Sequence, residues 1–291
     1  MPESSETPSR HGLDGVSVTL LTPLYGRAHA AELLPGTDFR DPLAERLLEE
    51  SGFRPPEVLT DRGNATGSVH RAIAIDALTE AFAARHPDGV VLSAGIGLDT
   101  RAHRLADRTP ATVTWLGVDL PQVIRLRREL LPAEPVRLHT GSVTEPGWHD
   151  AVAAETAGRP VLVLAEGLLM YLTQDELRGF LASCRAAFGP GTELAGDYFH
   201  PWVALSGRHP ITKATGARFR SGAADGRHLA ALVPGWRLAA EHPVLERIGP
   251  AHRAAATLFR LLTLGSRPYA VAHLEAVPGP VSAGPAAPSP G

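Results

Sequence analysis

The sequence predicts an α/β protein with a mainly parallel sheet covered by helices on both faces. Short apolar runs alternate with helical patterns along most of the 291 residues, which is typical of parallel strands joined by helices. The runs lack period-two alternation, so we expect strands that are buried on both sides. In chain order the expected strands are GVVLSA, TWLGV, PVRLH, PVLVLA, ELAGDY, GWRLAAEH and PYAVAHLE.

Composition favours one compact domain with additions, or two small ones. The chain is 44% hydrophobic and its net charge is −3, which allows a sizeable core and offers no basic excess for a nucleic acid. The longest apolar stretch, VLVLAEGLLMYL, is too short to cross a bilayer, and no apolar leader opens the chain. The histidines show no metal-ligand spacing. We therefore expect a soluble, cytoplasmic protein with no membrane, nucleic-acid or metal partner.

The two ends of the chain differ in composition from the middle. Residues 1–12 are polar, and residues 278–291 are rich in Pro, Gly, Ala and Ser, so both are expected to be disordered. The folded domain is expected over 13–277. It begins with a mostly helical extension over 13–60, and the irregular stretch 198–235 is expected to cover a site at the sheet edge.

Helical patterns fill the spaces between the strands. The first is expected over 68–84, with Ser68 as its N-cap. Arg71 and Asp76 interrupt its apolar rows; Asp76 is interpreted as an exposed charge, whereas Arg71 is either exposed or a clamp for a ligand carboxylate. Further helices are expected over 121–131, 174–188 and 251–264.

The first strand leads into a glycine turn. Gly95 and Gly97 follow it, and Asp119 ends the next apolar run, 22 residues after Gly97. Glycines let the backbone approach a ligand closely, and a carboxylate at this spacing can bind a ribose diol. Thr100 occupies the place of the third glycine of a dinucleotide fingerprint, which disfavours a nicotinamide dehydrogenase. Two plainer interpretations stay open: an ordinary strand-to-helix turn, and Asp119 as a cap of the helix that begins at Pro121.

A lone carboxylate lies in the apolar stretch that contains the fourth strand. An unpaired carboxylate there is costly, so Glu166 either faces solvent at the strand end or belongs to a site at the carboxyl ends of the strands. We favour the site, and Gly167 beside it allows close approach of a ligand.

The segments 13–60 and 198–235 are expected to form the walls of a pocket for the substrate. Apolar candidates in these walls are Leu20, Leu21, Leu24, Tyr25, Phe39, Phe199, Trp202 and Phe219, with Arg27, Arg208, Arg218 and Arg220 among them.

Six blocks of the sequence resemble the leucine carboxyl methyltransferase family, and within it the bacterial branch of tetracenomycin-type polyketide O-methyltransferases. The blocks are GVSVTLLTPLYGRA, DPLA, SAGIGLDTRAHRL, WLGVDLPQVIRLRRELLP, TGSVTEPGW and LAEGLLMYLTQDELRGFL. They occur in the family's order and cover about residues 13–275. The resemblance implies a class I methyltransferase fold, Rossmann-like, with a seven-stranded sheet whose last strand is antiparallel. It also implies S-adenosylmethionine as the methyl donor.

The resemblance implies a role for each of ten cofactor-binding residues. These are Arg71 at the methionine carboxylate, Ala94, Gly95 and Gly97 in the turn, Asp119 at the ribose, Leu120, Ser142 and Val143 at the adenine, and Glu166 and Gly167 at the methionine portion. Two positions depart from the family pattern. Ser142 stands where many relatives have aspartate, and Ile73 where many have a second arginine.

The implied reaction is an in-line attack of a substrate oxygen on a sulfonium methyl group. A carboxylate, with a pKa near 4, needs no base, whereas a phenol, with a pKa near 10, benefits from one. Tyr171, Tyr198 and His200 are weak candidates, and no base is assigned. Apolar walls with arginine suit a flat acceptor that bears a carboxylate, such as a polyketide-type secondary metabolite, although the arginines can equally serve solubility. The alternatives are a peptide or protein C-terminal carboxyl methyltransferase, a cofactor-retaining relative with no transfer or with C- or S-methylation, and a nicotinamide oxidoreductase.

Overall fold

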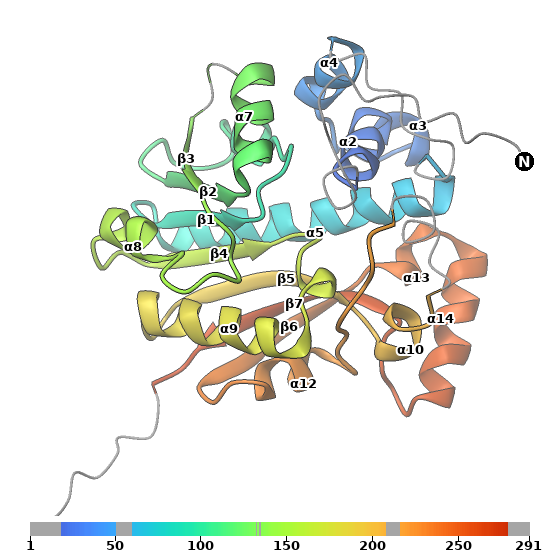
Figure 1. The fold of residues 1–291 in the computed structure, drawn as a ribbon. Coiled ribbons are helices and arrows are strands. Elements are labelled where there is room, and N and C mark those ends of the chain that lie inside the picture. Colours follow the sequence, from blue (N-terminus) through green and yellow to red (C-terminus); the bar gives the residue numbers. More distant parts are fainter. Residues whose placement is uncertain (1–18, 51–59, 132, 134, 208–215, 279–291) are drawn as a thin grey trace, which may run out of the picture.

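A seven-stranded sheet forms the centre of the protein (Figure 1). The computed structural model describes residues 19–50, 60–131, 133, 135–207 and 216–278. The strand order is β3-β2-β1-β4-β5-β7-β6, with β1 to β5 parallel and β7 antiparallel to both of its neighbours. The strands are β1 (Val90–Ala94), β2 (Thr114–Asp119), β3 (Val136–Thr140), β4 (Val161–Ala165), β5 (Glu193–Phe199), β6 (Trp236–Pro243) and β7 (Tyr269–Ala276). The predicted fold class and its seven expected strands are confirmed.

Alternate residues of the central strands supply two separate cores. Every residue of β1 and β4 is buried. Val90 and Leu92 pack into one core and Val91 into the other, because successive side chains of a strand point to opposite faces. Helices α8 (Asp150–Thr156), α9 (Gln174–Phe188) and α12 (Gly226–Ala231) cover the first face, and α5 (Arg62–Arg85), α6 (Arg101–Arg104) and α7 (Pro121–Leu130) cover the second. The continuous apolar runs are thus explained by burial on both sides.

Helix α5 begins earlier than the sequence indicates. Its N-cap is Asp61, whose carboxylate accepts a hydrogen bond from the Asn64 amide at 3.0 Å. The expected cap, Ser68, lies inside the helix and donates to the carbonyl oxygen of Ala65 at 2.8 Å. The prediction was wrong because glycines in the first turns of α5 weaken the helical pattern. With this earlier start, α5 reaches beyond the ends of the strands, and its first turns line a cavity there (Figure 1).

Two groups of short helices lie at the end of the sheet where the parallel strands finish (Figure 1). One group is α2 (Leu21–Ala28), α3 (Ala30–Leu33) and α4 (Pro42–Glu50); the other is α10 (Pro201–Ala204), α13 (Leu245–Ile248) and α14 (Pro250–Leu262). Helix α2 crosses α5 closely, since a side chain at Gly26 would lie 2.3 Å from the Ser68 hydroxyl. None of the described helices is long and apolar enough to cross a membrane.

The expected extents of the other helices agree closely with the structure. Helices α7, α9 and α14 match the expected ranges within two residues at each end. Thr173 and Glu176 form a capping box at the start of α9. The expected segment 1–12 and all of the expected tail 278–291 except residue 278 lie outside the described residues. The division of 13–277 into an extension, a domain and a cover stays a prediction.

Candidate active site

A cavity opens at the carboxyl ends of the strands. Its volume of about 390 Å³ is within the size range of small-molecule sites. A smaller cavity of about 50 Å³ adjoins it and shares residues such as Leu20, Arg71 and Glu166 with it. The structure brings the ten expected cofactor residues together around these two spaces. The larger is lined by Arg71, Gly95, Asp119, Leu120, Ser142, Val143, Glu166 and Gly167, and the smaller by Ala94 and Gly97 as well.

The glycine turn after β1 is tied to the end of β2. Gly95 and Gly97 have φ values of +68° and +52°, a region that favours glycine. Asp119 accepts hydrogen bonds from the amides of Gly97 and Leu120, each at 2.7 Å. The carboxylate therefore holds the turn, and the interpretation of Asp119 as the cap of α7 was wrong, since the N-cap of α7 is Leu120. Burial raises the pKa of Asp119, against the opposing effect of its two amide donors.

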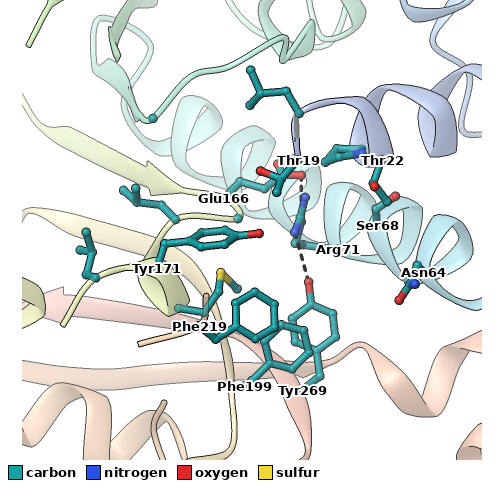
Figure 2. A pocket seen from close by; sticks show the side chains of 18 of the residues that line it. Thr19, Thr22, Asn64, Ser68, Arg71, Glu166, Tyr171, Phe199, Phe219 and Tyr269 are labelled. Atoms are coloured by element: carbon teal, nitrogen blue, oxygen red, sulfur yellow. Dashed lines mark hydrogen bonds and ion pairs between the residues drawn. The ribbon is translucent and has the colours of Figure 1, made fainter. Parts of the chain in front are cut away.

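Arg71 lies at the centre of the site and is 7% exposed (Figure 2). Its Nε donates to Glu166 Oε1 at 3.0 Å, and its Nη1 donates to Asp197 Oδ2 at 3.1 Å and to the Tyr269 hydroxyl at 3.3 Å. Asp197 also accepts from the Gly167 amide at 2.6 Å and from the Tyr269 hydroxyl at 2.8 Å. Arg71 is therefore not the exposed charge that one interpretation allowed. Its guanidinium is fixed by two carboxylates.

Glu166 is paired with buried arginines and does not simply face solvent. Its Oε2 accepts from Arg101 Nη2 at 2.6 Å. Burial by itself would raise the pKa of Glu166, but Arg71 and Arg101 hold it below its usual value. The carboxylate is thus ionised at the boundary between the two cavities.

The expectation that Asp76 is exposed was wrong. Asp76 is 3% exposed and accepts from Arg101 Nε at 2.6 Å and from Arg104 Nε at 2.7 Å. Two guanidinium groups from α6 neutralise the acid inside the protein, which removes the cost of burying it. The network of α5, α6 and the β4 end places the Glu166 carboxylate.

Aromatic rings form the wall of the larger cavity beyond Arg71 (Figure 2). Phe199 stacks on Tyr269 with ring centroids 4.2 Å apart and on Phe219 at 5.1 Å. Tyr171 meets Phe219 edge to face at 5.3 Å. Burial raises the pKa of Tyr171 to about 12, so its hydroxyl stays protonated at neutral pH.

Two of the three weak base candidates lie outside the cavities. The Tyr198 hydroxyl donates to Glu241 Oε1 at 2.5 Å, and His200 Nδ1 accepts from the Trp202 amide at the start of α10. Neither residue is among the described residues that line the larger or the smaller cavity. Tyr171 alone of the three faces the larger cavity, and its high pKa makes it a hydrogen-bond donor.

The acceptor walls differ from the predicted ones. Leu20, Phe199 and Phe219 line the larger cavity, whereas Arg27 reaches only the smaller one, where it donates to Asp41 at 2.9 Å. Arg208 is outside the described residues, and the other predicted wall residues among the described ones do not line the larger cavity: Leu21, Leu24, Tyr25, Phe39, Trp202, Arg218 and Arg220. Leu24 packs instead with residues of α4 and α7, and Phe39 packs with residues of α3 and α5.

Several lining residues carry no signal that the sequence analysis used. Asn64 and Gly63 come from the first turn of α5, and Leu245, Ile248 and His252 come from α13 and α14. Asp197 was also missed. It lies near the end of β5, as Glu166 follows β4, and that strand-end position was the available signal.

Comparison with known proteins identifies the family. A family model described as leucine carboxyl methyltransferase matches residues 22–184. The chain is also 34% identical over 236 residues to the tetracenomycin polyketide synthesis O-methyltransferase TcmP of Streptomyces glaucescens, covering 80% of this chain and 85% of that protein. The chain belongs to the leucine carboxyl methyltransferase family. The predicted resemblance is confirmed.

Other similarities agree with this membership. An S-adenosyl-L-methionine-dependent methyltransferase of Gibberella zeae, dpfgK, is 29% identical over 181 residues, which are 58% of this chain and 60% of that protein. A crystal structure of a candidate methyltransferase from Thermobifida fusca superposes with a TM-score of 0.60 at 14% identity, covering 94% of this chain and all of that one. At that identity the superposition shows a common fold.

Proposed function

We propose that this family member is an S-adenosylmethionine-dependent O-methyltransferase with a small, flat acceptor. The observation that carries the proposal is one cavity whose lining has two chemically different parts. One part, which ends at Arg71, has a glycine turn, a strand-end carboxylate and this buried arginine, and the part beyond Arg71 has a wall of stacked aromatic rings. The proposal is supported by the relatives TcmP and dpfgK, which are named as an O-methyltransferase and as an S-adenosyl-L-methionine-dependent methyltransferase.

The residues of the first part fit S-adenosylmethionine. A Cβ atom at Gly97 would lie 2.7 Å from Leu20, and one at Gly167 would lie 3.3 Å from Arg71, so both turns are as close-packed as a cradle for a ligand requires. We expect Asp119, which lines the cavity, to accept from a ribose diol with its remaining acceptor capacity. Among the described residues no hydrogen bond engages Arg71 Nη2, which leaves that nitrogen for the methionine carboxylate. Ser142 and Val143 line the same cavity, and we expect them to contact the adenine.

The protein contributes mainly orientation. The bound cofactor supplies an electrophilic methyl group, so the chain's task is to hold an oxygen nucleophile about 3 Å from it and in line. The aromatic wall from Phe199, Phe219 and Tyr171 excludes water and fixes the plane of a flat acceptor. The protonated Tyr171 hydroxyl can orient the acceptor oxygen by donating a hydrogen bond, and it is not the base.

Product analysis tests the proposal. The protein is incubated with S-adenosylmethionine and a panel of aromatic acids, phenols and C-terminal peptides, and both S-adenosylhomocysteine and the methylated acceptor are measured. We expect methyl esters or ethers of flat small molecules. Turnover on peptide C-termini alone would contradict the proposal and favour a protein carboxyl methyltransferase, and cofactor binding without methyl transfer to any acceptor would favour a relative that has lost transfer chemistry.

A further inference from the structure

We infer that the end of the larger cavity farthest from the glycine turn is an acceptor subsite that recognises a second, uncharged polar group of the substrate. Its recognising groups are Asp61, Asn64 and His252, around a space left open by Gly63. The inference rests on the proposed function, because it assumes that the acceptor occupies the part of the cavity beyond Arg71. It defines the substrate class more narrowly: a flat molecule with a hydroxyl or amide remote from the methylated oxygen.

Helix α5 sets the length of the acceptor space. Asn64, Gly67, Ser68 and Arg71 all line the larger cavity and recur at helical spacing on one face of α5. Seven residues separate Asn64 from Arg71, and at a rise of 1.5 Å per residue this is about 10 Å. A fused-ring acceptor whose reacting oxygen lies beside Arg71 therefore extends to Asn64.

The two long walls of this space differ in polarity (Figure 2). Thr22, Ser68 and Asn64 lie on one side, and Tyr171, Phe219, Phe199 and Tyr269 on the other. Thr22 Oγ1 and Asn64 Nδ2 are both buried and have no hydrogen-bond partner among the described residues, and Thr22 is only 2% exposed. Buried polar atoms are costly when left unpaired. A ligand with polar groups along one edge would satisfy them.

Gly63 leaves a gap between two side chains at the end of the cavity. A Cβ atom at Gly63 would lie 3.2 Å from Asp61 Oδ1 and 3.5 Å from His252 Nε2. The same space can hold one oxygen atom in contact with both groups. A hydroxyl there can donate to the carboxylate, which already accepts from the Asn64 amide but retains further acceptor capacity.

The charges of the lining disfavour an anionic group at this end. Asp61, Asp119 and Glu166 are the carboxylates that line the larger cavity. Arg71 is the only arginine among the described lining residues, no lysine is among them, and Arg71 is already held by two carboxylates. A second carboxylate on the acceptor would face the Asp61 carboxylate, and no arginine or lysine among the described residues lines this end to offset the repulsion. The recognised group is therefore neutral. Of the arginines that the sequence analysis offered for a carboxylate, Arg27, Arg218 and Arg220 do not line the larger cavity, and Arg208 lies outside the described residues.

Matched acceptors test the subsite. We compare 2,6-dihydroxyanthraquinone, which has a hydroxyl at each end of its ring system, with 2-hydroxyanthraquinone, using wild type, Gly63→Ala and His252→Ala. Wild type is expected to favour the dihydroxy compound about three- to tenfold in kcat/KM after correction for its two equivalent hydroxyls. The gain is modest for a carboxylate acceptor because Asp61 is exposed and also binds water. Both variants should lose this preference, measured within each variant as the ratio of its two kcat/KM values. Arg253→Gln, an exposed neighbour of His252 on α14, should keep the wild-type preference.

The outcomes separate the subsite from the proposed function. An unchanged preference in Gly63→Ala, or no preference in wild type, would overturn the subsite. Alanine favours the helix at position 63, so this variant remains informative if His252→Ala unfolds. If neither anthraquinone is methylated, the proposed acceptor class fails, and calorimetry with S-adenosylhomocysteine-loaded protein then decides the subsite. Tighter binding of the dihydroxy compound that is lost in Gly63→Ala supports it, and equal binding refutes it.

Discussion

Asp197 offers a sharp test of how the site is held together. Its side chain is fully buried and accepts from Arg71, from the Tyr269 hydroxyl and from the Gly167 amide. Asp197→Asn keeps the shape but replaces one acceptor oxygen with a donor. That donor must face either the Gly167 amide or, on the other side, Arg71 and the Tyr269 hydroxyl. The variant thus leaves a buried donor unpaired and removes one of the charges that hold Arg71.

The expected cost is about 2–4 kcal/mol, from an unpaired buried donor and a weakened buried ion pair. For a domain of this size that corresponds to a fall in melting temperature of about 4–10 °C, measured by thermal unfolding. Glu275→Gln is the control, because it removes an acid from the half-exposed pair with Arg237 and should cost less than about 1 kcal/mol. A melting temperature of Asp197→Asn equal to that of the control would refute the structural role of this cluster.

Three further predictions concern the same cavity. In Gly97→Ala, the φ of +52° and the 2.7 Å approach to Leu20 should destabilise the fold by about 1–3 kcal/mol in urea unfolding; an unchanged midpoint would contradict the tight turn. The lowered pKa of Glu166 means that its stabilising effect is complete above the ordinary pKa near 4.3 and is lost as the pH falls through the folded-state value. The difference in melting temperature between wild type and Glu166→Gln should therefore narrow below about pH 4, and a difference that grows there would show the opposite sign. Because the pKa of Tyr171 is about 12, Tyr171→Phe should keep the shape of the pH–rate profile up to about pH 10, whereas loss of an inflection below that pH would identify Tyr171 as a base.

Elements whose environment is uniform along the chain were predictable from sequence. The seven strands were found because burial on both faces leaves continuous apolar runs, as in β1 and β4. Asp119 and Glu166 were found because an acid at the end of such a run is conspicuous. Both carboxylates line the cavity, although the binding roles implied by the family resemblance stay predictions.

Features that depend on distant partners were not predictable. Asp76 was misjudged because its burial depends on Arg101 and Arg104, which belong to another helix. The acceptor walls were misplaced because α13 and α14 reach the cavity from the far end of the sequence, and nothing local to His252 indicates that it lies beside Gly63. The start of α5 was missed because its early glycines obscure the helical pattern that its packing against α2 stabilises.

Calorimetric titration of wild type and Asp119→Ala with S-adenosylhomocysteine tests the proposed function most directly. We expect heat of binding and a raised melting temperature in wild type. In the variant, affinity should weaken about ten- to 150-fold, the value of a buried charge-assisted hydrogen bond of about 1.5–3 kcal/mol. Absence of both heat and thermal protection in folded wild-type protein would contradict a cofactor site at this sheet edge. Unchanged affinity in folded Asp119→Ala would contradict the expected contact between the cofactor and the carboxylate at the end of β2.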